Sequence, residues 1–199
     1  MNKNLIIVFV RTPELGKVKT RLAKSIGDQS ALNIYKLLLK HTADVLHDLK
    51  FDKLVYYSGK LEEEDFWESN LFQKKLQKGA DLGERMQHAF ETAFDQGYEK
   101  VIIIGSDLFE LKPTHITTAF EVLESHEVAI GPSLDGGYYL LGMKQLEPAL
   151  FKNKKWGTDS VLKNTLKDLQ QQKVKLLEAL NDIDTFEDLL QQPELLKNI

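Results

Sequence analysis

An apolar run followed at once by a cationic loop, close to the amino terminus, constrains this chain most. Residues 5–10 read LIIVFV. This run of β-branched and aromatic side chains is too short for a globular helix, so it predicts a strand buried on both faces. A glycine-containing loop follows, and a helical pattern begins near Lys19. A buried strand, a flexible loop and a helix N-terminus form an arrangement that holds phosphate groups.

The loop is rich in cations, and they indicate what it binds. Arg11, Lys17, Lys19 and Arg21 lie within eleven residues, and Gly16 lets the main chain approach a ligand closely. These are more cations than a monophosphate needs, so they favour a di- or triphosphate. No GxxxxGK[ST] P-loop is present, and solvated surface cations are the alternative interpretation. The position after the first strand of an α/β chain favours the phosphate site.

Strand and helix patterns alternate along the rest of the chain, which predicts a mostly parallel sheet with helices on both faces. Strands are expected at 53–58, near 76, and at 100–104, 127–130, 138–143 and 174–177. Helices are expected at 28–49, with Asp28 as the capping residue, and at 80–94, 113–125, 158–171 and 185–191, with a short helix and a loop over 62–72. Two strands around a glycine-rich turn break the alternation at 127–143. The expected fold is therefore one α/β domain with a mixed sheet.

Length, charge and composition limit the functional classes. At 199 residues the chain can form one substantial core. Its formal charge of −4 argues against a nucleic-acid or anionic-membrane partner, since such binding depends on surplus Lys and Arg. The sequence has no cysteine, which excludes disulfides and thiolate sites. The apolar run at 5–10 is too short for a signal peptide or a membrane span. We expect a soluble, cytoplasmic protein.

Acidic residues follow two of the expected elements and are candidate metal ligands. Asp107 comes directly after the strand 100–104, behind a Gly-Ser turn, which would place it at the same sheet edge as the cationic loop. There it would bind Mg²⁺ or Mn²⁺, or alternatively only cap a turn. Asp184 is either a second metal ligand or the N-cap of the last helix, with Glu187 closing a capping box.

Residues 131–139, GPSLDGGYY, are dense in turn formers. Asp135, Gly136 and Gly137 are explained by a hairpin turn, or by backbone that approaches a ligand. Asp135 would then bind an acceptor or the metal, and Tyr138 would stack on a ligand. Asp81 with Glu84 has capping-box spacing, for which we prefer the structural interpretation. The five histidines show no metal-ligand spacing.

Six short motifs occur in order between Leu5 and Leu189, and together they resemble a known family. They are Gly16-x-x-Lys19-Thr20-Arg21-Leu22, Asp81-Leu82-Gly83-Glu84-Arg85-Met86, Gly105-Ser106-Asp107, Gly131-Pro132 with Asp135-Gly136-Gly137-Tyr138-Tyr139, Trp156-Gly157-Thr158, and Asp182-Ile183-Asp184-Thr185 with Glu187-Asp188-Leu189. The set resembles the CofC-like glycosyltransferases of the nucleotide-diphospho-sugar transferase superfamily, to which molybdenum-cofactor guanylyltransferases are related.

The resemblance implies a GT-A fold, a Rossmann-like α/β/α sandwich with a mixed, mostly parallel sheet, over residues 1–199. About 1–110 would form the nucleotide-binding half and about 111–199 the acceptor-binding half. Asp107 and Asp184 would hold the metal, and Lys19, Arg21 and Asp107 would be catalytic. The nucleotide-binding set would be Arg11, Gly16, Lys17, Lys19, Arg21 and Asp81, and the acceptor-binding set Asp135, Gly136, Gly137 and Tyr138.

The function expected from these features is a Mg²⁺- or Mn²⁺-dependent transferase that uses a nucleoside triphosphate or a nucleotide-sugar and a small-molecule acceptor. In a nucleotidyl version, an acceptor phosphate or carboxylate attacks the α-phosphorus and pyrophosphate leaves. In a glycosyl version, an acceptor hydroxyl attacks the sugar carbon. Phe109 and Ala80 stand where the family usually has Pro and Gly, so a catalytically reduced nucleotide-binding regulatory or scaffold protein is the alternative. A monomer and a homodimer both stay open.

Overall fold

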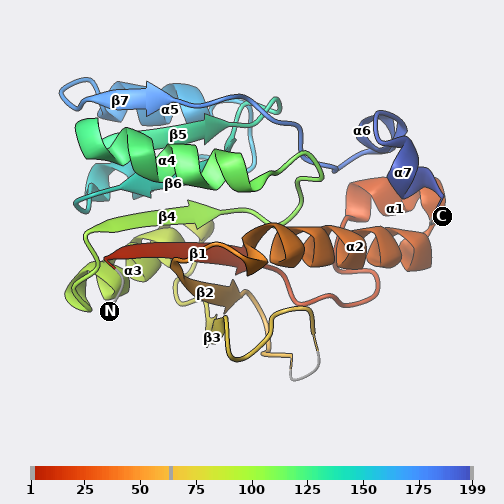
Figure 1. Ribbon diagram of the computed structural model, residues 1–199. Helices are drawn as coiled ribbons and strands as arrows, with labels where there is room; N and C mark the ends of the chain where they lie inside the picture. The colour runs from red at the N-terminus through yellow and green to blue at the C-terminus, as the bar shows by residue number, and fades with distance from the viewer. Residues whose placement is uncertain (1–2, 63–64, 198–199) are drawn as a thin grey trace.

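The computed structural model describes residues 3–62 and 65–197, and its centre is a seven-stranded sheet (Figure 1). The strand order is β3-β2-β1-β4-β6-β5-β7. The strands are β1 (Asn4–Val10), β2 (Asp52–Tyr57), β3 (Gln73–Leu76), β4 (Lys100–Ile104), β5 (Val128–Pro132), β6 (Tyr138–Met143) and β7 (Val174–Leu176).

Strand β1 lies near the middle of the sheet and is parallel to both neighbours. Ile7 is in register with Leu54 of β2 on one side and with Ile103 of β4 on the other. The sheet changes direction at β6, which is antiparallel to β4 and to β5. The predicted mixed sheet, with its reversal at 127–143, is therefore confirmed.

Helices cover both faces of the sheet. They are α1 (Thr20–Ile26), α2 (Asp28–His47), α3 (Leu82–Asp95), α4 (Pro113–Ser125), α5 (Val161–Asp168), α6 (Phe186–Leu190), α7 (Pro193–Leu196) and the 3₁₀-helix η1 (Pro148–Phe151). Figure 1 shows α4 in front of the sheet and α3 and α5 behind it. Helix α2 extends past the carboxyl end of β1 toward α1, α6 and α7, which are grouped beyond that edge of the sheet. No helix in the described ranges is both long and apolar enough to cross a membrane.

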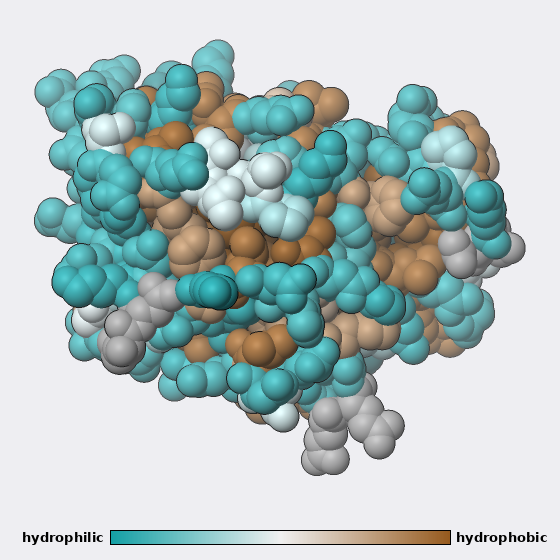
Figure 2. All heavy atoms as spheres, viewed as in Figure 1, coloured by the Kyte–Doolittle hydropathy of each residue, from teal (hydrophilic) through white to brown (hydrophobic). Residues whose placement is uncertain are grey.

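The core has one layer on each side of the sheet. Alternate side chains of β1 enter opposite layers: Ile6 and Val8 pack with α2 and α4, whereas Leu5 and Ile7 pack with α3. All four are fully buried, as the apolar run predicted. A third, smaller cluster joins α1, α2, α6 and α7. The face in Figure 2 is mostly hydrophilic, and brown side chains show between the charged ones near this cluster.

Two helix caps differ from the expectation. Asp28 is the first residue of α2, and the N-cap is Gly27, whose φ of 82° is unfavourable for other residues. The N-cap of α6 is Thr185, which accepts a hydrogen bond from the Asp188 backbone and closes a capping box with it. The predicted cap at Asp184 with Glu187 was wrong by one residue, and Asp184 is free for other contacts.

Two other predicted helices also differ from the structure. The helix expected at 158–171 covers only Val161–Asp168, because residues 158–160 form a turn before it. No helix occurs in the described part of 62–72, where 65–67 form bends and 69–71 form a turn; residues 63 and 64 of that expected helix lie outside the described residues.

Candidate functional site

Lys19 is the centre of a charge cluster at the carboxyl edge of the sheet. It ends the loop after β1, at the N-cap position of α1, and its φ of 47° is rare outside glycine. Its Nζ donates to Asp107 Oδ2 at 2.8 Å and lies 3.7 Å from Asp184 Oδ1. Its side chain is only 5% exposed. Burial acts to lower the pKa of Lys19, but the attraction of these carboxylates outweighs it and holds that pKa above its ordinary value.

Three distant segments meet at this ammonium group. Asp107 follows β4, and the Ile183 N–H donates to its backbone carbonyl at 3.1 Å, which ties the segment before α6 to that turn. Arg21 Nη1 on α1 donates to Asp184 Oδ2 at 3.1 Å. Burial would raise the pKa of Asp107, but Lys19 beside it holds that pKa below its ordinary value. The structure thus brings together the four residues predicted to carry the chemistry.

Arg11, Gly16 and Lys17, which are also predicted to bind the nucleotide, belong to the same loop after β1 as Lys19. Arg11 is exposed, and its backbone N–H and C=O bond the Tyr35 hydroxyl at 2.9 and 3.1 Å. Gly16 has a φ of 72°, in the region that glycine favours. Lys17 is paired with Glu14 at 2.6 Å and stays 72% exposed.

Asp81 has the structural role that we preferred. It is the N-cap of α3 and accepts a hydrogen bond from the Glu84 N–H at 2.9 Å. Glu84 in turn accepts from the Ala80 N–H at 2.8 Å. The cap does not exclude a ligand contact, because Asp81 is exposed.

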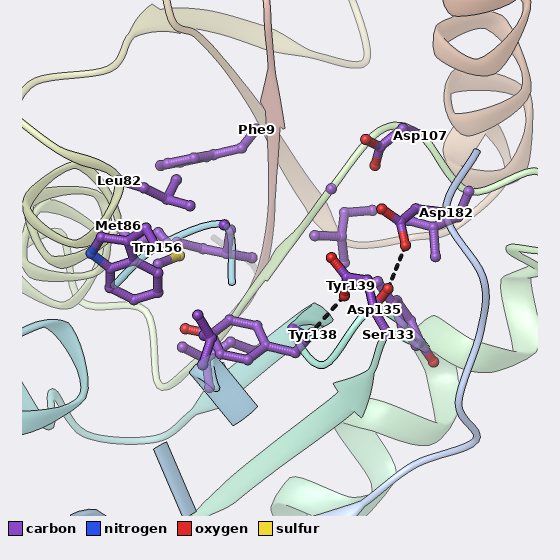
Figure 3. A pocket seen from close by; sticks show the side chains of 18 of the residues that line it. Phe9, Leu82, Met86, Asp107, Ser133, Asp135, Tyr138, Tyr139, Trp156 and Asp182 are labelled. Atoms are coloured by element: carbon purple, nitrogen blue, oxygen red, sulfur yellow. Dashed lines mark hydrogen bonds between the residues drawn. The ribbon is translucent and has the colours of Figure 1, made fainter. Parts of the chain in front are cut away.

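A pocket of about 220 Å³ opens beside Asp107, on the side of the sheet that α3 covers (Figure 3). Aspartates lie at one end of it, and Leu82, Met86 and Trp156 form the other end. Its walls come from β1, α3, β4, β6, the first residue of α5 and the loops at 105–108, 133–137, 156–158 and 182. Asp107, Asp135, Gly137 and Tyr138 are the predicted site residues that line it. Gly136 and the predicted nucleotide-binding residues lie outside the pocket wall.

The turn before β6 is built as the sequence suggested. Asp135 Oδ1 accepts the Gly137 N–H at 2.8 Å, and Gly136 has a φ of 89°. A Cβ on Gly136 would lie 2.4 Å from the Asp159 carbonyl oxygen, so this position requires glycine. Tyr138 lines the pocket with its ring; its buried hydroxyl has no hydrogen-bond partner among the described residues. Burial raises the pKa of Tyr138, which keeps it a neutral phenol.

Asp182 also belongs to the site, although no role was predicted for it from the sequence. It lines the pocket and accepts a hydrogen bond from the Ser133 hydroxyl (Figure 3). Burial raises the pKa of Asp182, as do the neighbouring carboxylates of Asp107 and Asp135. Its spacing from Asp184 was the available signal, because alternate residues of an extended segment lie on the same side.

The donor chemistry of this edge fits a divalent cation. Asp107, Asp182 and Asp184 are carboxylates on two adjoining segments, and carboxylate oxygens are the ligands that Mg²⁺ prefers. The described residues contain no group of three His, Cys, Asp or Glu side chains already arranged around one point. Asp107 and Asp184 are instead paired with cations of the chain itself, Lys19 and Arg21.

Solved structures share this fold. A candidate nucleotide-diphospho-sugar transferase from Desulfovibrio desulfuricans G20 is 32% identical, with a TM-score of 0.90 over 98% of this chain and 88% of that one. A nucleotidyl transferase from Methanothermobacter has 14% identity and a TM-score of 0.70, and each chain is covered completely. The 4-diphosphocytidyl-2C-methyl-D-erythritol synthase from Anaerococcus prevotii has 14% identity and a TM-score of 0.62, over 98% and 96%. The expected GT-A type of α/β fold is confirmed.

The family follows from a second comparison. No curated protein matches the chain significantly. The family described as "Uncharacterized protein conserved in bacteria (DUF2064)" matches residues 41–158. This match includes Asp81, Asp107 and the turn before β6. Because it covers more than half of the chain, and the Desulfovibrio protein is similar over nearly all of it, the chain belongs to the DUF2064 family.

Proposed function

We propose that this protein is a metal-dependent transferase that moves a nucleotidyl or glycosyl group from a nucleoside triphosphate or nucleotide-sugar to a small acceptor. The contact between Lys19 and Asp107 carries the proposal, since it joins the cationic loop and the expected metal carboxylate at one edge of the sheet, beside a pocket. The names of the similar structures support it: one is a candidate nucleotide-diphospho-sugar transferase and another a nucleotidyl transferase.

The loop after β1 would bind the phosphates. Arg21 and Lys17 keep 67% and 72% of their side chains exposed, so they can reach a ligand without rearranging the core. Gly16 presents its backbone without a Cβ. Lys19 is buried, and its ammonium would fix Asp107 in position and add positive charge behind the phosphates.

Asp107 and Asp184 would hold Mg²⁺ or Mn²⁺, with Asp182 adjacent to them. A divalent cation at this point would neutralise charge on the phosphates as the leaving group departs. The chain itself supplies positioning and a fixed electrostatic field, and no covalent nucleophile is required. In the nucleotidyl version an acceptor oxygen bonds to the α-phosphorus as its bond to pyrophosphate breaks. In the glycosyl version it bonds to the sugar carbon, and a nucleoside diphosphate leaves.

The first test is thermal stabilisation by each nucleoside triphosphate and each common nucleotide-sugar, with and without Mg²⁺. A ligand at 100 times its Kd should add about 2.7 kcal/mol to the free energy of unfolding. We expect this only when metal and the correct nucleotide are both present. Stabilisation by nucleotide-sugars alone would select the glycosyl version, and by triphosphates alone the nucleotidyl version.

Two exposed cations on α1 provide a matched pair of variants. Arg21→Gln should weaken nucleotide binding, whereas Lys24→Gln, also exposed but in the last turn of α1, should not. No metal-dependent shift with any nucleotide would contradict the proposal. Tight binding with no turnover of any nucleotide-sugar or triphosphate would instead support the scaffold alternative.

A further inference from the structure

The pocket beside Asp107 has an uneven distribution of charge. Its ionisable lining groups, apart from two tyrosines, are the carboxylates of Asp107, Asp135 and Asp182. No Lys, Arg or His is among the described residues that line it. The pocket is therefore electronegative at the end where Figure 3 shows Asp107 and Asp182.

The nearest cation offsets the charge of Asp107 but leaves the charges of Asp135 and Asp182 in the lining. The ammonium of Lys19 is already engaged by Asp107 at 2.8 Å and by Asp184 at 3.7 Å, and its side chain is 5% exposed. It does not line the pocket. With the proposed Mg²⁺ in place, its charge would be balanced by Asp107, Asp184 and the phosphates of the donor. The carboxylates of Asp135 and Asp182 would then still repel a carboxylate or phosphate group that enters the pocket, and such like-charge contacts are costly.

The opposite end of the pocket is apolar and shaped by aromatic rings. Leu82 on α3 is 42% exposed, and Met86 and Phe9 lie beside it in the wall. Trp156 packs closely on α3, because a Cβ at Gly83 would lie 2.7 Å from the indole Cζ2. This close contact holds the indole in place, and a fixed aromatic wall binds ring-shaped apolar groups at little entropic cost.

We infer that the acceptor is an uncharged or cationic small molecule with an apolar, ring-sized body and a hydroxyl or amine directed at the aspartates. This inference rests on the proposed function and narrows the class of acceptor. It disfavours the phosphate or carboxylate acceptor of the nucleotidyl version. In the transfer, the acceptor oxygen or nitrogen bonds to the donor's sugar carbon or phosphorus, the bond to the leaving phosphate breaks, and the acceptor proton passes to solvent.

Fluorescence can test the inference with three matched probes: benzyl alcohol, benzylamine and phenylacetate. The chain has two tryptophans, and Trp67 is buried away from the pocket, so quenching reports on Trp156. The alcohol and the amine should bind at least about tenfold more tightly than phenylacetate, a difference of about 1.4 kcal/mol. Trp156→Phe should abolish the signal. The titrations are repeated with Mg²⁺ and a stabilising nucleotide, and the same order of affinity is expected.

A variant pair tests whether the carboxylates cause the preference. Asp135→Asn removes one charge of the lining and should improve phenylacetate binding severalfold relative to benzyl alcohol. Asp159→Asn removes a charge near the same turn that does not line the pocket, and should leave the ratio unchanged.

The possible outcomes separate the two proposals. If phenylacetate binds as tightly as the alcohol, the inferred preference for an uncharged or cationic acceptor is wrong. If no probe quenches the fluorescence, the inferred apolar body of the acceptor is wrong. Both results leave nucleotide binding at the Lys19 cluster intact. If no nucleotide stabilises the protein but the probes follow the expected order, the proposed function fails and the ligand class of the pocket stands.

Discussion

The ion pair between Lys19 and Asp107 joins a buried cation to a partly exposed anion, and this asymmetry makes a sharp prediction. The Lys19 side chain is 5% exposed and that of Asp107 is 36% exposed. Removing Asp107 leaves an ammonium that water scarcely reaches. Removing Lys19 leaves carboxylates that water can hydrate. Asp107→Asn should therefore destabilise the fold more than Lys19→Met, although each variant deletes one charge of the same pair.

The structure sets the expected magnitudes. Breaking a fully buried ion pair by removing one partner costs about 3–5 kcal/mol. For Asp107→Asn we expect about 2–4 kcal/mol, since Asp184 remains 3.7 Å from the ammonium and solvent screens part of the effect. For Lys19→Met we expect about 1–2 kcal/mol. The double variant should be at least about 1 kcal/mol more stable than Asp107→Asn alone, because Met at position 19 buries no charge.

Equilibrium unfolding in urea, followed by circular dichroism, measures all three variants. Lys3→Met is the control, because its pair with Glu99 lies at the surface with both side chains more than half exposed. It should cost less than about 0.5 kcal/mol. A cost for Lys19→Met equal to that of Asp107→Asn, or a double variant no more stable than Asp107→Asn, would refute the reasoning.

The same pair predicts a pH dependence. The pKa of Asp107 is lowered in the folded state, so its stabilisation is present above the ordinary carboxyl pKa and is lost as pH falls through the lower folded value. The pKa of Lys19 is raised, so its stabilisation is present below the ordinary lysine pKa and is lost as pH rises through the higher folded value. The stability difference between wild type and Asp107→Asn should be constant from about pH 5 to 9 and shrink below about pH 4. An unchanged difference at pH 3 would contradict this.

Two further predictions concern backbone geometry, and the same urea titration checks them. Gly136→Ala should cost about 3 kcal/mol or more, because φ is positive and the Cβ would meet the Asp159 backbone at 2.4 Å, whereas Gly157→Ala, also at positive φ but with nothing within 4 Å, should cost about 1 kcal/mol. Equal costs would show that the close approach is relieved elsewhere. Thr185→Ala removes the N-cap of α6 and should lower the free energy of unfolding by about 1 kcal/mol. A loss of only about a few tenths of a kcal/mol would show that Asp184 replaces Thr185 as the cap.

The elements of the sheet could be predicted from local patterns. The segments 5–10 and 101–104 are continuous apolar runs, and each of the two strands has another strand on both sides in the sheet. The reversal at β6 was visible as two strand patterns around a glycine-rich turn. The sequence also indicated that Lys19 and Asp107 would approach one another, because both follow parallel strands of one sheet.

The details of the site depended on contacts that local patterns do not contain. Asp184 and Thr185 are both good N-cap residues. In the structure Thr185 closes the capping box with Asp188, whereas Asp184 binds Arg21, which lies 163 positions away in the chain. The burial of Lys19 is another example. Its neighbours in the sequence predicted a phosphate-binding cation, with a solvated surface cation as the alternative. In the structure, the turn after β4 and the segment before α6 bury its side chain.

The direction of β6 explains why the charge cluster and the pocket lie together. In a purely parallel sheet, only residues that follow strands reach the carboxyl edge. Because β6 is antiparallel to β4, with Leu140 paired to Ile104, the residues that precede β6 reach the same edge as those that follow β4. Asp135 and Tyr138 thereby face Asp107 across one pocket. The reversed strand β6 thus places the proposed acceptor wall opposite the proposed phosphate-binding edge, and inverting β6 would separate the two halves of the proposed site.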